Sequence, residues 1–238
     1  MLYSWDAFSL FAESVSQAEM PVEVGHALRT LLQPFGIEAC LVAELAPTVE
    51  ATRGPQILAD LWPKSWSTHY FENNLVAHDP CASLCLRTNQ LFSWRSVALQ
   101  SLSDNENAVM KSAEAFGLKD GFCLPLHGAS GQVGVISLAG KQIERWSSLR
   151  PLIEAAGFCA YQKILRLREE SVQPLLTKRQ AEICNWIASG KTAADTATIL
   201  GITEATVERH LRDTRERLGT VNRVHTIVAA IKRREIRV

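Results

Sequence analysis

The stretch TKRQAEICNWIASGKTAADTATILGITEATVERHLRDTRERLG, Thr177–Gly219, decides the fold of the C-terminal part of the chain. Thr177 and Gln180 fit a capping box, in which each side chain accepts a hydrogen bond from the backbone N–H of the other residue. Thr192 with Asp195 repeats this signal, and Thr203 fits the cap of a further helix. The stretch therefore predicts three short helices.

Apolar residues lie on one side of each of these helices. They are Ile183 and Ile187 in the first, Ala197 and Leu200 in the second, and Val207, Leu211 and Leu218 in the third. Gly190 fits the end of the first helix and Gly201 a tight turn after the second. A helix, a short turn with glycine and a helix with a polar outer face form a helix-turn-helix, whose second helix enters the DNA major groove.

The charged face of the third helix also permits another interpretation. Glu208 and Arg212 are four residues apart, as are Arg209 and Asp213, and both pairs could form ion pairs along the helix. The face would then need no ligand. Spacing alone leaves a DNA-binding unit and a solvated helical bundle both open.

The residue pattern of this segment is more specific than its periodicity. It contains LT-x-R-x-A-E-I-x-x-W-I-A-x-G-K-T, then G-I-T-E-A-T-V-x-x-H-L, then R-L-G. This pattern closely resembles the C-terminal DNA-binding domain of the LuxR family. We expect DNA contacts from five residues: Lys191, Thr206, Glu208, Arg209 and Arg212. Lys191 would contact a phosphate, and the other four, on the reading helix, would contact the groove.

Three residues depart from that family pattern. Gln180 replaces a typical Glu, which keeps the cap but removes a charge, and Cys184 replaces a typical Leu. Glu208 stands where the family usually has Asn or a base. A carboxylate there can accept from cytosine N4 but repels phosphate, which points to an operator that differs from the common one.

Length and composition are those of a globular protein with room for two domains. Of 238 residues, 47% are hydrophobic and 21% charged. No apolar run reaches the ~18 residues of a membrane helix, and the N-terminus lacks the basic start of a secretion signal. We therefore expect a cytoplasmic protein that has no membrane partner.

The net charge is zero, but the charges are unevenly distributed. Residues 1–175 hold 13 basic and 18 acidic side chains, whereas residues 176–238 hold 12 basic and 7 acidic ones. A basic C-terminal part on an acidic body fits a DNA-binding module attached to a domain that does not contact DNA.

Six cysteines are scattered without a pairing pattern, so we expect reduced thiols: Cys40, Cys81, Cys85, Cys123, Cys159 and Cys184. The nearest approach to a metal motif is His78-x-x-Cys81-x-x-x-Cys85. It lacks a second paired half and lies in an apolar stretch. We expect neither a metal nor another cofactor.

The N-terminal part predicts helices before, between and after antiparallel strands. Helices are expected over 5–16, 22–34, 62–73, 79–86, 106–116 and 148–168, and strands over 37–45, 57–61, 90–94, 122–126 and 132–138. The last two strands form a hairpin around the small residues 127–131. This order predicts an α+β sandwich over residues 1–168, a linker over 169–175 and an all-α four-helix domain over 176–238.

Aromatic and polar side chains are scattered through an apolar region of the first domain: Trp62, Trp66, Tyr70, Asp79, Trp94 and Ser137. Trp66 and Tyr70 project from one face of a helix. Indole N–H and phenol O–H groups can satisfy the carbonyls of a buried ligand, and Asp79 could accept from a ligand amide. Alternatively, the tryptophans are ordinary core and Asp79 caps the helix after Pro80.

Four short motifs in this region are W-x-x-x-Y, D-P, a tryptophan fourteen residues after that proline, and G-x-x-x-P-L-H-G. Together they resemble the autoinducer-binding domain of the LuxR family, a GAF/PAS-like α/β/α sandwich. The resemblance implies an N-acyl-homoserine lactone as ligand. It implies that Trp66 donates to the lactone carbonyl, that Asp79 accepts the ligand amide N–H, and that Tyr70 contacts the acyl carbonyl region.

The same resemblance implies further roles in the pocket. Trp94 would pack against the lactone ring, Ser137 would lie near the amide and carbonyl groups, and Gly121 would be a structural glycine. Two residues depart from the family. Trp62 stands where a tyrosine is common, and Cys123 replaces a frequently polar residue, so the acyl chain of the ligand is open.

These observations predict a ligand-responsive transcriptional regulator and not an enzyme, because no metal-ligand set or nucleophile–base arrangement is visible. A receiver domain is excluded, because two helices precede the first strand. The expected partners are double-stranded operator DNA with an inverted repeat, the lactone, a second copy of the chain and RNA polymerase. The dimer would use the long helix around Leu152–Ile164 and an apolar stripe of the last helix, over 222–234. This stripe consists of Val224, Ile227, Val228 and Ile231. Alternatively, the stripe only closes the core of its own domain.

Two alternatives remain open at this point. One is an orphan regulator of the same fold that senses a molecule other than a lactone, or none, with Trp62 as its best support. The other is an antagonist that forms a heterodimer with a related regulator, which the mixed charge of the third helix permits.

Overall fold

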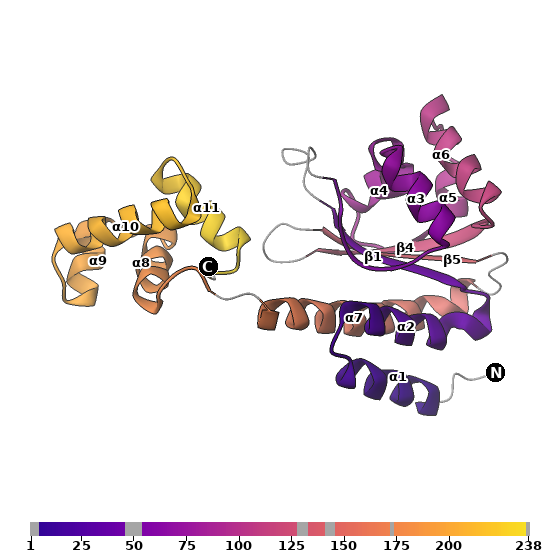
Figure 1. Cartoon of the computed structure of the whole chain (residues 1–238), viewed down its shortest axis with the longest axis horizontal. Helices are drawn as coiled ribbons and strands as arrows, with labels where there is room; N and C mark the ends of the chain where they lie inside the picture. Colours follow the sequence, from indigo (N-terminus) through magenta and orange to yellow (C-terminus); the bar gives the residue numbers. More distant parts are fainter. Residues whose placement is uncertain (1–4, 46–53, 128–132, 141–145, 172–173, 237–238) are drawn as a thin grey trace. The chain divides into compact units, whose positions relative to one another are not determined.

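The computed structural model of the chain describes residues 5–45, 54–127, 133–140, 146–171 and 174–236. The chain divides into two compact units, Met1–Ser171 and Val172–Val238. The first unit combines helices with one sheet and the second is helical (Figure 1). Within the described ranges, none of the helices has the length and apolar character needed to span a membrane.

A five-stranded antiparallel sheet forms the centre of the first unit, with the strand order β2-β1-β5-β4-β3. Its strands are β1 (Ala39–Leu45), β2 (Gln56–Leu61), β3 (Phe92–Ser93), β4 (Asp120–His127) and β5 (Val133–Gly140). The predicted hairpin is confirmed, because β4 and β5 pair along their whole length. Most of its turn, residues 128–132, lies outside the described residues.

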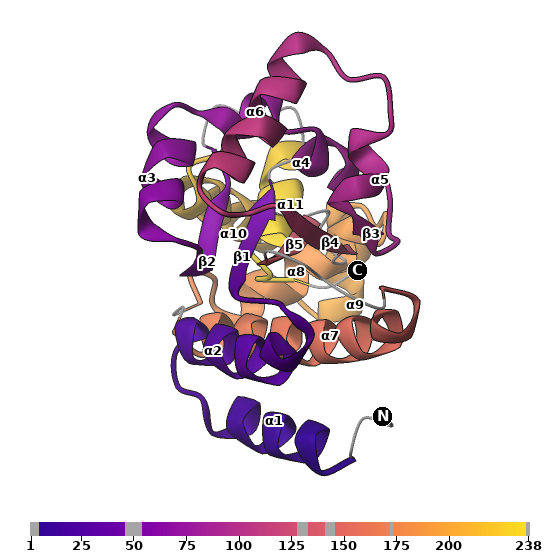
Figure 2. The same ribbon diagram turned by 90° about the vertical axis from the view of Figure 1, so that its right-hand side faces the viewer.

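Helices cover both faces of this sheet (Figures 1 and 2). On one face lie α2 (Pro21–Leu32), which runs into the 3₁₀ turn η1 (Gln33–Phe35), α7 (Trp146–Ser171) and, outside them, α1 (Trp5–Gln17). On the other lie α3 (Lys64–Glu72), η3 (Leu75–His78), α4 (Pro80–Cys85), α5 (Trp94–Ala98) and α6 (Asp104–Ala115). The predicted α/β/α sandwich is confirmed.

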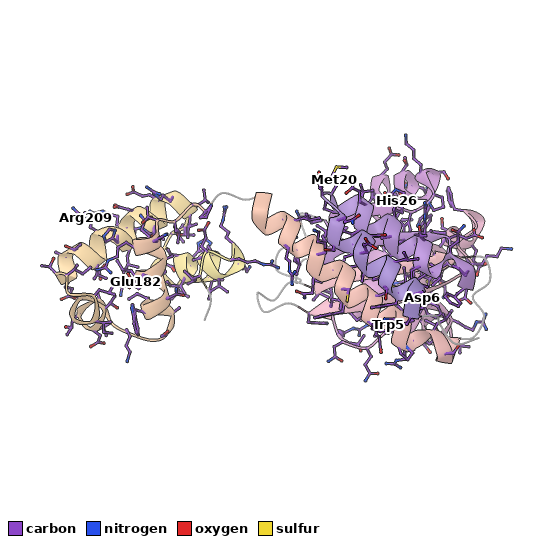
Figure 3. All side chains as sticks on the ribbon, turned by 90° about the horizontal axis from the view of Figure 1, so that it is seen from below. Trp5, Asp6, Met20, His26, Glu182 and Arg209 are labelled. Atoms are coloured by element: carbon purple, nitrogen blue, oxygen red, sulfur yellow. The ribbon has the colours of Figure 1, made fainter. Side chains whose placement is uncertain are left out.

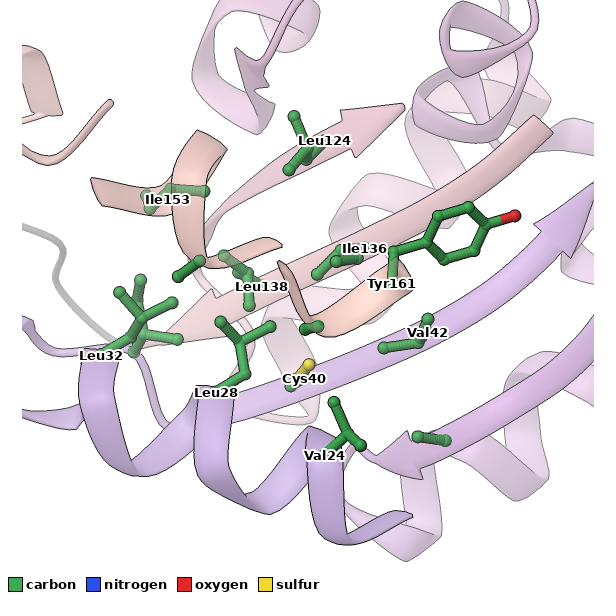
Figure 4. Packing of buried hydrophobic residues seen from close by; sticks show 14 of the residues in the cluster. Val24, Leu28, Leu32, Cys40, Val42, Leu124, Ile136, Leu138, Ile153 and Tyr161 are labelled. Carbon is green, nitrogen blue, oxygen red and sulfur yellow. The ribbon is translucent and has the colours of Figure 1, made fainter. Parts of the chain in front are cut away.

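Side chains alternate along a strand, so each central strand contributes to both layers. Cys40 and Val42 of β1 pack against α2 and α7, while Leu41 and Ala43 face the side of α3–α6. Figure 4 shows the first of these layers, in which Leu28 of α2 meets the strands. Both faces are covered, so every residue of β5 is buried.

The strand predicted over 90–94 is wrong at its C-terminal end. Only Phe92 and Ser93 pair with β4, and Trp94 begins the helix α5. The hydroxyl of Ser93 accepts a hydrogen bond from the Ser96 backbone N–H and so caps this helix. The cap directs the chain into a helical turn and places the indole of Trp94 on the α3–α6 side.

Helix α7 extends to Ser171 and therefore includes the first residues of the expected linker, 169–175. Its apolar stripe packs in the core against α2 and the sheet: Leu149, Ile153, Ala156, Ala160 and Ile164. These side chains are occupied within their own domain, so the dimer expected to use the long helix around Leu152–Ile164 would need the outer side of that helix. On the outer side of α7, Phe158 is 55% exposed.

The second unit consists of four helices, as predicted: α8 (Lys178–Ala188), α9 (Ala193–Leu200), α10 (Glu204–Leu218) and α11 (Arg223–Lys232). The capping boxes at Thr177 and Thr192 are both present, and the Thr203 hydroxyl caps α10. Gly201, between α9 and α10, has a φ of 62°, a left-handed conformation that glycine adopts without strain. The helix-turn-helix is therefore α9 and α10.

Gly140 lies at the end of β5, close to the backbone of the turn that follows α2. A Cβ atom at position 140 would lie 1.8 Å from the carbonyl oxygen of Gly36. This neighbour is backbone and cannot rotate away. We expect Gly140→Ala to lower the free energy of unfolding by about 2–3 kcal/mol, at the upper end of the usual range for overpacking.

Gly25→Ala is the matched control for this variant. Its Cβ atom would lie 3.0 Å from Leu61 Cδ1, the end of a flexible side chain, and alanine favours the helix. Denaturant unfolding of both variants measures the difference. Equal destabilisation would contradict the role given to the Gly36 carbonyl.

Candidate ligand pocket and nucleic-acid interface

A pocket with about 650 Å³ of empty space, part of it open to solvent, lies between the sheet and the helices α3–α6. All six side chains that the sequence singles out line it: Trp62, Trp66, Tyr70, Asp79, Trp94 and Ser137. They come from segments up to 75 residues apart, on α3, the loop before α4, α5 and β5. Tertiary folding therefore brings the whole predicted set to one cavity.

Two tryptophans, one on α3 and one just before it, line this pocket. Trp66 is 2% exposed, and the indole Nε1 atoms of Trp62 and Trp66 are buried without a hydrogen-bond partner. An unpaired buried donor destabilises a protein by about 1–3 kcal/mol. The rings themselves are well packed, with the centroids of Trp62 and Trp66 6.1 Å apart. The rings thus form part of the pocket wall, while their two indole N–H groups lack an acceptor.

Asp79 joins α3 to α4 at the wall of the pocket. Its Oδ2 accepts the Tyr70 hydroxyl at 2.7 Å, and its Oδ1 accepts the backbone N–H groups of Cys81 at 2.7 Å and Ala82 at 3.3 Å. The alternative that Asp79 caps the helix after Pro80 is confirmed. Capping does not exhaust the carboxylate, because each of its oxygens can accept two hydrogen bonds.

The electrostatics of this pair follow from its burial. Burial raises the pKa of Asp79 to about 6, against the opposing effect of the Tyr70 hydroxyl and the two N–H donors. Burial, together with the neighbouring Asp79, also raises the pKa of Tyr70 well above its ordinary value. Tyr70 therefore remains a donor, and Asp79 titrates near neutral pH.

Trp94 and Ser137 meet at Cys123 on the floor of the pocket. Trp94 Nε1 donates to Cys123 Sγ at 3.3 Å, and Ser137 Oγ lies 4.0 Å from the same sulfur. A Cβ atom on Gly121 would lie 2.6 Å from the Trp94 ring and 2.5 Å from the Leu138 carbonyl oxygen. The absence of a side chain at Gly121 makes room for the indole, which is the structural role implied by the resemblance.

The apolar lining of the pocket is the part that sequence reasoning missed. Leu41, Ala43 and Leu45 line it from β1, and Met110 and Ala113 from α6. The strict alternation of β1 marks the first three as one face, but it does not say which face meets a cavity. His69 of α3 contacts Ser112 of α6 at 3.1 Å and so ties the two covering helices together.

The reading helix α10 presents the predicted DNA contacts on its outer side. Arg209, labelled in Figure 3, and Arg212 are exposed. Neither has an ion pair or side-chain hydrogen bond within the described part of the chain. Lys191, before α9, is also exposed. The hydroxyl of Thr206 lies 2.8 Å from that of Thr203, so it belongs to the start of the helix.

Glu208 is held by a residue that the sequence did not suggest. It forms an ion pair with Arg223 at the start of α11. The pairs Glu208–Arg212 and Arg209–Asp213 do not occur among the ion pairs of the described residues. The interpretation of α10 as a helix paired along its own face is therefore wrong, and its two central arginines keep their charge available.

Described His, Cys, Asp and Glu side chains form no group of three that could hold a metal ion. The first unit thus offers a pocket with hydrogen-bonding groups, and the second a helix-turn-helix with exposed cations. Two family models match this division: the autoinducer binding domain over residues 21–164, and the bacterial regulatory proteins of the luxR family over residues 174–230.

The chain belongs to the LuxR family of bacterial transcriptional regulators. Transcriptional activator protein BjaR1 of Bradyrhizobium diazoefficiens is 30% identical over 95% of this chain and 94% of its own length. The quorum sensing-dependent regulator RpaR of Rhodopseudomonas palustris is 31% identical over 93% and 91%. The expectation of a quorum-sensing regulator that is not an enzyme is confirmed by these relatives.

Solved structures share the fold of the chain. SdiA of Escherichia coli matches with a TM-score of 0.75 at 21% identity, covering 98% of both chains. A second SdiA structure, in complex with octanoyl-rac-glycerol, matches with the same TM-score at 20% identity. The LuxR-family architecture of an α/β domain followed by a helix-turn-helix domain therefore describes this chain over nearly its whole length.

The raised pKa of Asp79 predicts a specific dependence of stability on pH. Between the ordinary aspartate pKa of 3.8 and about 6, the folded chain holds a proton that the unfolded chain has released. This contribution to stability is therefore present at low pH and is lost as the pH rises through about 6. We expect Asp79→Asn to be nearly as stable as the wild type at the acidic end of this pH range. At neutral pH the wild type has lost this contribution, so the variant should be more stable in comparison with it.

Thermal unfolding of the ligand-free wild type and of Asp79→Asn across this range measures the effect. The difference in Tm between them isolates Asp79 from the other titrating groups. A difference that stays constant with pH would show that the carboxyl group titrates as an exposed one.

Proposed function

We propose that the first unit binds an N-acyl-homoserine lactone in its pocket, and that the second binds an inverted-repeat operator as part of a dimer. Such a regulator would act in the cytoplasm, where the operator lies. The family membership supports autoinducer and DNA binding in general terms. The choice of ligand and the assignment of residues rest on the chemistry of the pocket and of α10.

The observation that carries the ligand assignment is the pair of unpartnered indole N–H groups of Trp62 and Trp66. They favour a ligand with two acceptor oxygens, because such a ligand removes two unpaired donors. Asp79 adds an acceptor with spare capacity. A lactone carbonyl, an amide carbonyl and an amide N–H form the complementary set, and an acyl-homoserine lactone carries all three.

The remaining walls suit the rest of such a ligand. The lining of the pocket is mostly apolar with a few polar groups, which is typical of small-molecule sites. Trp94 offers a ring for packing against the lactone, and the apolar residues of β1 and α6 suit an acyl chain. Filling this space would stabilise the folded first unit by mass action.

Acylglycerols are a second ligand class to be tested. Octanoyl-rac-glycerol occupies SdiA, a protein of the same fold. An acylglycerol shares the ester carbonyl and the acyl chain, and it lacks the amide N–H that would meet Asp79. A regulator that senses such a compound is the second candidate function.

Trp66→Phe removes one indole N–H and keeps an aromatic ring. We expect its affinity for N-hexanoyl-homoserine lactone to fall by about tenfold, which corresponds to one hydrogen bond of about 1–1.5 kcal/mol. Asp79→Asn should weaken the lactone similarly and octanoyl-rac-glycerol less. Isothermal titration measures both, with Trp5→Phe as control, because Trp5 is 78% exposed and does not line the pocket.

The outcomes separate the two ligand classes. Tight binding of acylglycerol with no heat from butanoyl to dodecanoyl lactones would support the second candidate. Unchanged lactone affinity in Trp66→Phe would mean that this indole does not contact the ligand.

A dimer is supported by the surface of α11. Val224 and Val228 of α11 are 74% and 42% exposed and lie four residues apart on one side of the helix, and Val221, just before the helix, is 77% exposed. Ile227 and Ile231 of the expected stripe pack instead on the core of the second unit. The exposed valines form a self-complementary apolar contact if two copies meet about a two-fold axis.

Arg212→Ala tests the reading helix. We expect weaker operator binding and a slope of log affinity against log salt that is smaller by about one if the residue meets phosphate. An unchanged slope with relaxed base preference would instead assign Arg212 to a base edge. Arg150→Ala, whose side chain pairs with Glu154 on the first unit, is the control. Gel-shift titration at several salt concentrations measures both, and equal losses in the two variants would exclude a specific contact.

A further inference from the structure

Three thiols converge beside the pocket, although the sequence shows no pairing pattern. Cys81 and Cys85 lie one turn apart on α4, and Cys123 lies on β4, against which α4 packs. All three are buried and free. The side chains of Cys81, Cys85 and Cys123 belong to one buried cluster.

Cys123 is the centre of this group. Trp94 Nε1 donates to its sulfur at 3.3 Å, and its cross-strand partner Ser137 lies with Oγ 4.0 Å away. A sulfur surrounded by donors is stabilised as the thiolate, which is the form that reacts with oxidants. The pKa of Cys123 accordingly lies well below its usual value, chiefly because of Cys81 and Cys85.

Cys81 and Cys123 differ from the buried Cys85 and Cys40 in their position at the pocket. Cys81 and Cys123 both line the pocket, so a molecule that enters it meets these two residues. Cys85 is fully buried and does not line the pocket. Cys40 lies in the opposite core, and burial raises the pKa of its thiol to about 12, which leaves it unreactive.

We propose that Cys81 and Cys123 form a peroxide-sensitive pair whose oxidation to a disulfide switches the pocket off. The Cys123 thiolate attacks hydrogen peroxide and becomes a sulfenic acid, and hydroxide leaves and takes up a proton to form water. The Cys81 sulfur then attacks the sulfenic sulfur and displaces its hydroxyl group, which leaves as water with the Cys81 proton. One peroxide is reduced to two waters for each disulfide formed.

The bond would change two of the groups assigned to the ligand. The backbone N–H of Cys81 donates to Asp79, so a shift of Cys81 toward β4 disturbs the carboxylate. Trp94 loses the thiolate that accepts its N–H. This consequence for ligand uptake rests on the proposed function, whereas formation of the disulfide depends only on the thiols.

Peptide mapping of the full chain after treatment with hydrogen peroxide tests the proposal. Trypsin leaves Cys81 and Cys85 together in residues 65–87 and Cys123 in residues 120–141. The exposed Cys159 is first replaced by Ser to prevent links between chains. We expect a cross-link between the two peptides, a loss of two alkylatable thiols per chain, and reversal by dithiothreitol, while Cys40 stays reduced.

Single variants assign the pair. The cross-link should disappear in Cys123→Ser and in Cys81→Ser and persist in Cys85→Ser. A wild type that keeps all three thiols alkylatable overturns the proposal, and so does oxidation of Cys40 at the same rate, which would indicate unfolding. A cross-link that is lost only in Cys85→Ser would overturn the choice of Cys81. The wild-type result stands even if a variant fails to fold.

A second measurement connects the pair to the pocket. N-hexanoyl-homoserine lactone should raise the Tm of the reduced protein, and this increase should be lost after peroxide and return with dithiothreitol. An equal increase in the oxidised protein, with the cross-link present, would overturn the switch. If the reduced protein shows no increase, the lactone assignment fails for this compound, while the cross-link remains an independent result.

Discussion

The rest of the first unit depends on a sheet that has to bury both of its faces. Because side chains alternate, β1, β4 and β5 each supply one row to the core under α2 and α7 and another row to the side of α3–α6. The first row is filled by large aliphatic side chains and packs tightly. The second includes smaller and polar side chains such as Ala43, Cys123 and Ser137, and there the pocket remains. The rigid core on one side thus supports the cavity on the other.

Within the pocket, the buried carboxylate of Asp79 sets the chemistry. Its side chain caps α4 and accepts the hydroxyl of Tyr70. It also accepts the backbone N–H of Cys81, one of the three buried cysteines beside the pocket. A charge in this position is unfavourable in the empty protein, which its raised pKa reflects. A ligand donor would improve this environment, just as ligand acceptors would satisfy Trp62 and Trp66. Under the proposed function, stability and ligand recognition would therefore depend on the same groups.

The second unit depends more on helix caps, because its helices are short and its core is small. Caps at Thr177, Thr192 and Thr203 fix where the helices begin, and one apolar cluster holds them together. The ion pair between Glu208 and Arg223 ties α10 to α11 at the surface. It draws the acidic side chain toward α11, which reduces its repulsion of phosphate, and Arg209 and Arg212 in the middle of the reading helix stay exposed.

The sequence by itself determined the features that depend on a few neighbouring residues. Capping boxes, the apolar periodicity of the helices and the alternation of the hairpin strands are local, so the order of elements and the helix-turn-helix could be predicted. The residues of the candidate site stood out as aromatic and polar side chains in an apolar region, and motif resemblance gave them roles, since periodicity cannot bring Trp66 and Ser137 to one cavity. Only the tertiary structure decided which face of α7 is buried, that Glu208 meets Arg223, that two indole N–H groups lack partners and that Cys81 and Cys123 line one pocket. Each of these is a contact between segments far apart in the chain, and such contacts depend on how whole layers pack.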